Sequence, residues 1–173
     1  NKENILLPYL TSKDNSYNMS SNIFKNKDTH INLGYMQTED KFSLDKKGYV
    51  FSYVNLKKDN AILAGVTTEN GGFLDNKFNG AFALDENDNP TNFIGFRQNV
   101  KLGKNELMFV SSYGSTKVST SPNSLITNID NVDTISFSAN LSRKEVLNKK
   151  DRLIFSISQP QRVESGRMTY LVP

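Results

Sequence analysis

Hydrophobic and polar residues alternate over much of the chain. Between residues 135 and 141 the apolar positions are Ile135, Phe137, Ala139 and Leu141, and the positions between them hold Ser or Asn. A period of two is the side-chain repeat of a β-strand. The same alternation, interrupted by turn residues at regular intervals, predicts strands at 31–35, 42–44, 49–54, 61–67, 78–84, 93–101, 107–113, 135–141, 153–158 and 167–172. This spacing is typical of an antiparallel barrel or sandwich.

The pattern therefore predicts an all-β fold, an antiparallel β-barrel or β-sandwich of about eight to ten strands. Such a domain is either complete or a truncated part of a larger barrel. Residues 1–28 are expected to be a lead-in or linker, and residues 29–173 the β-domain. The small polar residues on one side of each expected strand suit the interior of a barrel whose exterior faces lipid. They suit equally the solvent-exposed outer face of a soluble sandwich. The expected strands, about seven to nine residues long, are short for a membrane strand of roughly 9–11 residues.

Two connections depart from the regular spacing of the expected turns. Residues 115–133 are rich in Ser, Thr and Asn and longer than a usual hairpin loop. There, Ser121 and Pro122 predict the N-cap and first position of a short helix, whose buried face would be Leu125, Ile126 and Ile129. Residues 143–151 form a second charged connection, for which we expect a helical turn.

Composition narrows the function classes. The chain has 173 residues, enough for one domain with a core, and 36% of them are hydrophobic. About one residue in eight is Asn, which favours turns. The net charge of +3 comes from mixed, scattered charges, so nucleic acid is not an expected partner. The chain has no Cys, which excludes disulfides and thiolate metal sites, and its single His30 excludes chemistry that needs two imidazoles.

Candidate chemistry is sparse. A subtilisin-like enzyme needs Asp, His and Ser in three separate motifs, and the sequence holds none of them. The stretch 85–89 (DENDN) offers oxygen ligands, but it lacks the Gly and terminal Glu of a helical calcium loop and is expected to be a turn without metal. Gly71-Gly72 lacks the continuation of a phosphate-binding loop. We therefore predict no catalytic residue, no metal and no cofactor.

We recognise no export signal within the sequence. No apolar run approaches the 18 residues of a membrane-spanning helix, and the chain starts at Asn1 without a recognisable signal peptide. We expect a processed piece or a cloned fragment, with any export signal upstream of residue 1.

The C-terminal stretch 151–173 reads DRLIFSISQPQRVESGRMTYLVP. It resembles a block, approximately D-R-L-x-x-x-x-S-Q-P-L-R-V-x-S-G, in the autotransporter-like β-region that follows the catalytic domain of bacterial secreted subtilisin-like (S8 family) serine peptidases. Gln161 replaces the usual Leu of that block. The matching positions are Asp151, Arg152, Gln159, Pro160, Arg162, Val163 and Gly166. Looser similarity extends to the stretches 33–36, 93–114 and 134–146, and none of it covers a catalytic domain.

The resemblance implies a non-catalytic accessory domain that acts in cell-surface anchoring, export or assembly. It also implies an extracellular or outer-membrane location in a bacterium, with the outer membrane or the parent protease domain as partner. Two other hypotheses remain open. One is a self-associating structural β-protein of a fibre or surface layer, and the other is an extracellular binding module.

The last expected strand carries a prediction about assembly. Pro160 cannot donate to a β-ladder, so it should mark a bend or bulge. If the β-domain is part of a larger sheet, the strand at 163–172 would be an edge without its neighbour, and Arg167 is the only charge after Ser165. We expect homo-oligomers or filaments that form through this edge.

Overall fold

A computed structural model describes residues 16–38, 45–148 and 151–172, and it confirms the all-β antiparallel prediction. Eight strands form one sheet in the order β1-β2-β3-β4-β7-β8-β10-β11. Their bounds are β1 Ser16–Lys25, β2 Thr29–Thr38, β3 Lys46–Asn55, β4 Asn60–Asn70, β7 Asp88–Leu102, β8 Asn105–Thr116, β10 Val132–Lys144 and β11 Arg152–Ser165. The described residues include no helix that is long and apolar enough to cross a membrane.

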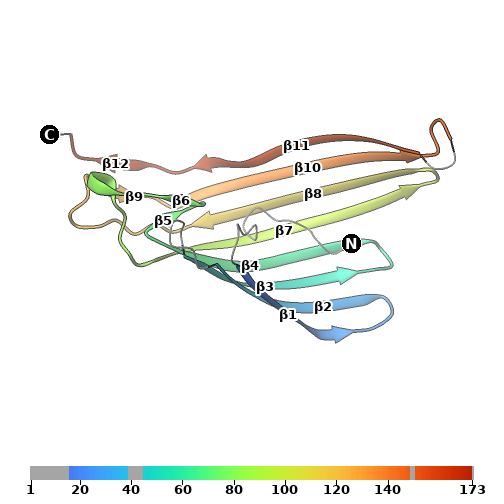
Figure 1. The fold of residues 1–173 in the computed structure, drawn as a ribbon, viewed down its shortest axis with the longest axis horizontal. Coiled ribbons are helices and arrows are strands. Elements are labelled where there is room, and N and C mark those ends of the chain that lie inside the picture. The colour runs from blue at the N-terminus through green and yellow to red at the C-terminus, as the bar shows by residue number, and fades with distance from the viewer. Residues whose placement is uncertain (1–15, 39–44, 149–150, 173) are drawn as a thin grey trace.

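The sheet is a meander, because each strand pairs with the preceding long strand of the chain. Figure 1 shows β1 and β11 at its opposite borders. Within the described residues no pairing joins these two strands, so the described sheet is open. Its strands have 10 to 15 residues and exceed the expected seven to nine. The reason is that pairing continues through terminal Asn, Ser and Thr residues, which sequence alone assigns to turns.

The two ends of the sheet differ. At one end the connections are tight, at residues 26–28, 56–59 and 103–104. At the other end β4 and β7 are separated by 17 residues, 71–87, and β8 and β10 by 15 residues, 117–131. We call these the turn end and the loop end. The short elements β5 (Gly72–Phe73), β6 (Asn76–Lys77), η2 (Gly80–Phe82), β9 (Ile126–Ile129) and β12 (Met168–Tyr170) all lie at or beyond the loop end.

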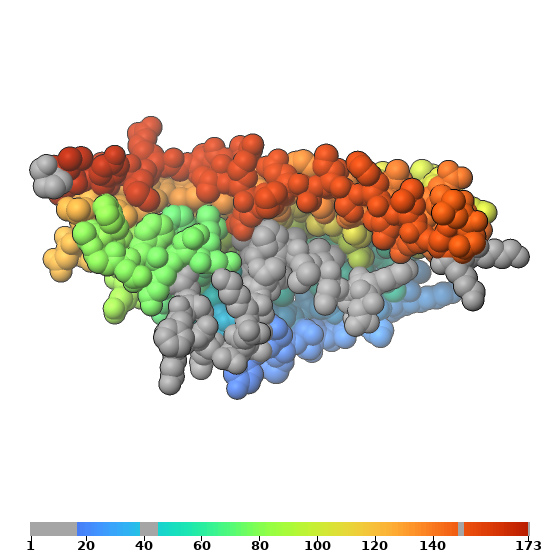
Figure 2. Space-filling view, turned by 45° about the horizontal axis from the view of Figure 1, so that its top comes forward, coloured from blue at the N-terminus to red at the C-terminus, as the bar shows by residue number. Residues whose placement is uncertain are grey.

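The loop-end segments build a small core of their own. Its buried residues are Leu84, Val118, Ile126, Ile129 and Val132, and Phe73, Leu74 and Phe78 pack against them. The rings of Phe73 and Phe78 stack with centroids 5.2 Å apart. In Figure 2 the segment between β4 and β7 is green and lies against the orange and red C-terminal strands. This loop-end layer thus joins segments that are far apart in sequence.

Several local predictions need correction. Part of the expected lead-in, Ser16–Lys25, forms strand β1; residues 1–15 and the predicted strand at 42–44 lie outside the described residues. The expected strand at 78–84 is replaced by η2, because Gly80 has a φ of 65° and leaves the extended conformation.

The two expected helical segments are also wrong. Ser124 N–H donates to the Ser121 carbonyl in a turn, and Ile126–Ile129 is strand β9, paired with β12. That partner lies about forty residues away in sequence, so local pattern could not reveal it. In the connection 143–151, Glu145 has a φ of 56° and the side chain of Asp151 closes the turn, so that no helix forms among its described residues.

The second apolar cluster lies within the sheet. Ala61, Leu63 and Phe93 are buried, and Val50 and Val54 pack against them. The ring of Phe93 crosses Gly65, where a Cβ atom would lie 2.6 Å from Phe93 Cζ and 2.3 Å from the carbonyl oxygen of Tyr49. Only glycine allows this close approach of strand and ring.

Replacing Gly65 by Ala should therefore lower the free energy of unfolding by about 1–3 kcal/mol, as overpacked sites do. Urea unfolding followed by far-ultraviolet circular dichroism measures the change. The matched control is Ala64→Val, whose half-buried side chain lies on the opposite face of the same strand. Equal stability of the two variants would contradict the role assigned to Gly65.

Candidate functional site

One face of the sheet is apolar and uncovered. The register places large hydrophobic side chains from every strand on this face, and they are exposed. They are Tyr17, Met19, Leu33, Tyr49, Phe51, Ile62, Ile94, Phe96, Leu107, Phe109, Tyr113, Phe137, Leu141, Leu153, Phe155 and Ile157. Phe137, at the middle of β10, is still 36% exposed. A continuous apolar surface of this extent marks a contact with lipid or with another protein.

On β10, charged residues flank the apolar face at both ends. On β10 the outward positions run from Asp133 to Arg143, and Ile135, Phe137, Ala139 and Leu141 lie between them. Lys47 and Asp88 lie at the loop end and form an ion pair of 2.9 Å, which raises the pKa of Lys47. The ten residue-to-residue steps from Asp133 to Arg143 correspond to about 34 Å of strand at 3.4 Å per step.

Tyrosines gather near the loop-end border of the apolar face. Tyr35 on β2 lies opposite Tyr49 on β3, and their ring centroids are 5.1 Å apart. The Tyr35 hydroxyl donates to Gln37 Oε1 at 2.6 Å, so it points toward the polar border. Tyr17 and Tyr113 share this face on β1 and β8. An apolar ring with a polar tip suits the boundary between an apolar and an aqueous phase.

The opposite face, here called the polar face, carries many small polar residues beside the buried cluster of Ala61, Leu63 and Phe93. Its central positions include Asn32, Ser52, Ser112, Ser136, Ser138, Asn140, Ser142, Ser156 and Ser158. Asn32 Nδ2 donates to Ser52 Oγ at 3.0 Å, and the hydroxyls of Ser112 and Ser136 are 2.6 Å apart. Hence the large exposed side chains lie on the apolar face, and the more buried face carries both the small polar residues and the Ala61–Leu63–Phe93 cluster.

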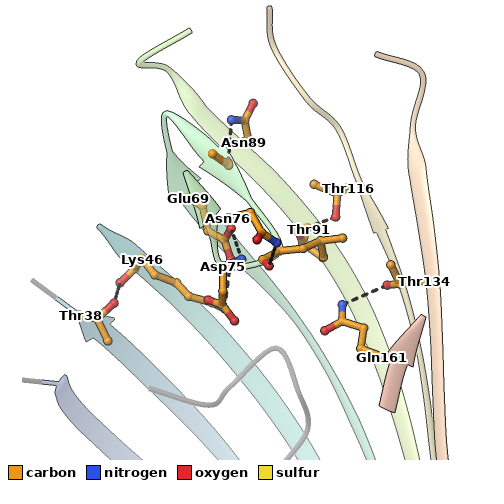
Figure 3. Close-up of polar contacts among 12 residues, drawn as sticks. Thr38, Lys46, Glu69, Asp75, Asn76, Asn89, Thr91, Thr116, Thr134 and Gln161 are labelled. Carbon is orange, nitrogen blue, oxygen red and sulfur yellow. Dashed lines mark hydrogen bonds and ion pairs between the residues drawn. The ribbon is translucent and has the colours of Figure 1, made fainter. Parts of the chain in front are cut away.

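A buried ion pair fastens the loop-end layer to this polar face (Figure 3). Lys46 Nζ lies 3.1 Å from Glu69 Oε1 and 3.0 Å from Asp75 Oδ1. The backbone N–H of Asp75 donates to Glu69 Oε2 at 3.1 Å. Both Lys46 and Glu69 are buried, on β3 and β4, whereas Asp75 belongs to the segment 71–87. The segment is therefore held over the inner face of the strands.

A second set of contacts acts in the same region. Asn89 is fully buried; its Nδ2 donates to the Gly72 carbonyl and its Oδ1 accepts from the N–H of Ser119. It thus ties both long loops to β7. Beside it, the hydroxyls of Thr91 and Thr116 are 2.8 Å apart, and both residues are buried.

At the turn end a row of alternating charges crosses the polar face. Asp59 pairs with Lys101 at 3.0 Å and accepts a hydrogen bond from Asn99, which also donates to Glu106. Glu106 in turn lies 3.3 Å from Arg152. Burial opposes ionisation of Asp59, but the bonds from Lys101 and Asn99 outweigh it and lower its pKa. The bond from Asn99 is also the main reason why the pKa of Glu106 is lowered.

The residues of the C-terminal block shape strand β11. Asp151 accepts hydrogen bonds from the backbone N–H groups of Val146, Leu147 and Asn148 at 2.7, 2.6 and 3.1 Å. These bonds close the turn before the strand. The next residue, Arg152, donates to Ser142 Oγ at 2.7 Å and so takes part in the charged row.

The middle of the block lies where β11 changes register against β10. Phe137 is opposite Gln159, but Ile135 is opposite Arg162, so Pro160 lies at a bulge on a border strand, as expected. Arg162 pairs with Glu164, and Val163 lies opposite Thr134. Gly166 ends the strand with a φ of 154°. The seven block residues are thus spread along one strand and do not converge on a single site.

The remaining candidates have ordinary places in the fold. His30 is half-buried on β2, opposite Val54. In the stretch 85–89, Asp88 and Asn89 belong to β7 and are engaged by Lys47 and the loops. Over the described ranges no cluster of three or more His, Asp or Glu side chains is arranged to hold a metal ion. We did not predict the Lys46–Glu69–Asp75 contact from the sequence. The sequence hinted at it only through Lys46 and Glu69, which are charged residues at inward-facing positions of two strands.

Comparison with known proteins gives no relative: no family model matches, and neither do curated proteins or solved structures.

The Lys46→Met variant should lose about 3–5 kcal/mol of unfolding free energy, because Glu69 then stays buried without its partner. Urea unfolding measures the loss. A second substitution, Glu69→Leu, should restore most of it by removing the uncompensated charge. The control is Lys47→Met, which breaks an exposed, solvent-screened pair and should cost far less than Lys46→Met. A loss in Lys46→Met no larger than in this control would contradict the buried anchor.

The β10–β11 turn should depend on pH through Asp151. Desolvation raises the pKa of Asp151, but the three backbone N–H donors outweigh it and the net pKa is lowered. At pH values above the unfolded-state pKa of about 4, the ionised side chain therefore stabilises the turn. This effect is lost as the pH falls through the lower pKa of the folded state. Amide-exchange protection of residues 146–148 should drop on acidification in the wild type. In Asp151→Asn it should be low at every pH; a wild-type-like pH profile there would contradict the assignment.

Proposed function

We propose that the chain is a membrane-embedded β-domain of a bacterial surface protein. It acts as a non-catalytic accessory domain that anchors or exports a subtilisin-like serine peptidase. The membrane part rests on one observation: the large hydrophobic side chains on one face of an eight-stranded sheet are exposed. The peptidase part rests on the resemblance of residues 151–166 to the family's β-region.

The dimensions of the sheet support a bilayer as the apolar environment. Strands of membrane barrels are tilted by about 40°, so the 34 Å between Asp133 and Arg143 would span about 26 Å along the membrane normal. The outward apolar band of such barrels is about 25 Å tall. Strands of 10 to 15 residues also reach the roughly 9–11 residues that a crossing needs.

The ends of the sheet support an outer-membrane orientation. Barrels of this class have short periplasmic turns and longer extracellular loops. The turn end, with connections such as residues 103–104, fits the periplasmic side. The loop end, with residues 71–87 and 117–131, fits the cell exterior, and the tyrosines near it fit the aromatic girdle of the outer interface.

A self-associating structural protein is the second candidate. It is favoured by strand β11, which forms one border of the described sheet. The edge differs from the one expected from sequence, since Met168–Tyr170 pairs with β9 and the border strand is Arg152–Ser165. A fibre subunit would, however, leave the whole apolar face in water, which a membrane domain does not.

Tryptophan fluorescence tests the membrane proposal, because the chain contains no Trp. Phe109 and Met108 are neighbours on β8 but face opposite sides of the sheet. In vesicles of lipids brominated on their acyl chains, Phe109→Trp should be quenched several-fold more strongly than Met108→Trp. Equal quenching of the two variants, or none at either, would show that the apolar face does not contact lipid.

The peptidase part has a separate test, which is the complete open reading frame. It should encode the Asp, His and Ser motifs of a subtilisin-like enzyme ahead of this domain. A reading frame without them would contradict the peptidase link and leave the membrane proposal standing.

A further inference from the structure

The turn end of the sheet carries a surplus of positive charge. Most carboxylates of this end are already engaged, in the ion pairs Asp59–Lys101, Glu106–Arg152 and Glu145–Lys104. The exposed cations that lie in no ion pair within the described residues are Lys25, Lys27, Lys57, Lys58, Arg143 and Lys144, which we call the basic rim. These charges therefore have no carboxylate of the described chain to neutralise them.

The loop end has the opposite balance. Its described carboxylates outside ion pairs are Asp45, Asp85, Glu86, Asp130 and Asp133. Fewer cations of this end lie outside ion pairs in the described part of the chain, namely Lys77, Lys117 and Arg167. An anionic partner is therefore attracted to the turn end and repelled by the loop end.

The backbone holds the basic rim in place. In Figure 1 the turns β1–β2, β3–β4 and β7–β8 lie at the same end of the sheet. Three hydrogen bonds of 2.8, 2.9 and 3.0 Å tie these turns to their neighbours: Leu56 N–H to the Asp28 carbonyl, Asn99 N–H to the Asp59 carbonyl, and Lys144 N–H to the Lys104 carbonyl. The cations are thus carried on a fixed backbone at the border of the sheet.

The strand register places Arg143 just beyond the apolar face. Across β7, β8, β10 and β11 the last fully apolar outward row is Val100, Leu107, Leu141 and Phe155. The next outward row toward the turn end is Leu102, Asn105, Arg143 and Leu153. Arg143 follows Leu141 by two residues, which is about 7 Å of strand. The headgroup region of one leaflet is roughly 5–7 Å thick, so Arg143 would lie among the headgroups when Leu141 lies in hydrocarbon.

The side chains of the rim suit a phosphate ligand. A guanidinium can bind two phosphate oxygens at once, and a lysine ammonium acts as a point charge. Asn105 lies directly opposite Arg143 and adds an amide donor beside it. Leu102, which is 64% exposed in the same row, adds an apolar contact for the acyl chain below the headgroup.

We propose that the basic rim binds the headgroups of anionic phospholipids. Arg143 and Asn105 hold one headgroup phosphate, and Lys57 and Lys58 attract those of neighbouring lipids. The charge difference between the two ends then sets the turn end in an anionic leaflet. This inference rests on the proposed membrane-embedded function and names the lipid class that the domain selects.

Selective quenching tests the proposal, with Leu102→Trp as a reporter in a chain that has no other Trp. Two sets of vesicles contain phosphatidylcholine and phosphatidylglycerol at four to one. Bromine is carried on the acyl chains of the phosphatidylglycerol in one set, and of an equal amount of phosphatidylcholine in the other. Brominated phosphatidylglycerol should quench the reporter about threefold more strongly. Most of this excess should vanish in 1 M salt, where the Debye length falls to about 3 Å.

A charge-matched pair of variants shows whether the rim is responsible. In Lys57→Gln/Lys58→Gln/Arg143→Gln the two brominated lipids should quench Leu102→Trp equally. The control Lys77→Gln/Lys117→Gln/Arg167→Gln removes two lysines and one arginine from exposed positions of the loop end and should keep the excess. A second reporter, Tyr113→Trp at the loop-end border of the apolar face, should show no excess in the unmodified background.

Equal quenching of Leu102→Trp by the two lipids would overturn the anionic-lipid site, and it is the result expected if the rim binds an acidic protein surface instead. An excess that the rim variant retains, or that the control variant loses as fully, would also overturn it. If Phe109→Trp is quenched in the same vesicles, each of these results leaves the membrane proposal standing. An unquenched Phe109→Trp would overturn both.

Discussion

The large apolar side chains on one face of the sheet are exposed, and exposed apolar surface is unfavourable in water. This constraint orders the rest of the molecule. The inner face makes its contacts through the buried Ala61–Leu63–Phe93 cluster and through hydrogen bonds such as Asn32–Ser52 and Asn99–Glu106. Stability on the inner side thus depends on satisfied polar groups, which are costly to leave unpaired away from water.

The two ends of the sheet are stabilised by different contacts. At the turn end, tight connections and a row of alternating charges hold neighbouring strands in register. At the loop end, the larger of the two hydrophobic clusters lies around Leu84, Ile126 and Val132, mostly in the connecting segments. The contacts of Asp75 with the buried Lys46–Glu69 pair join the loop-end segment to the strands. The molecule therefore combines a sheet that has one exposed apolar face with a small layer that has a buried apolar core.

Much of the sheet could be predicted from sequence, because alternation is a local signal. The predicted strands at 61–67, 93–101, 107–113 and 135–141 are all present in the sheet. Alternation does not say which face meets water, so the exposure of Phe137 required the structure. Contacts over long separations, such as β9 with β12 or Lys46 with Asp75, have no local signal. The apparent helix at 121–129 was wrong for the same reason.

The meander has a consequence for how the sheet forms. Every long strand pairs only with its neighbours along the chain, so each hairpin needs the closure of a single connection, and most connections at the turn end are short. Low loop-closure entropy favours rapid, stepwise zipping from one hairpin to the next. A strand added in the wrong register would present its aromatic residues to the polar side, and the error would be confined to the growing border. The order of strands in the chain thus doubles as an order of assembly, from which the border strands β1 and β11 emerge with one side still to be paired.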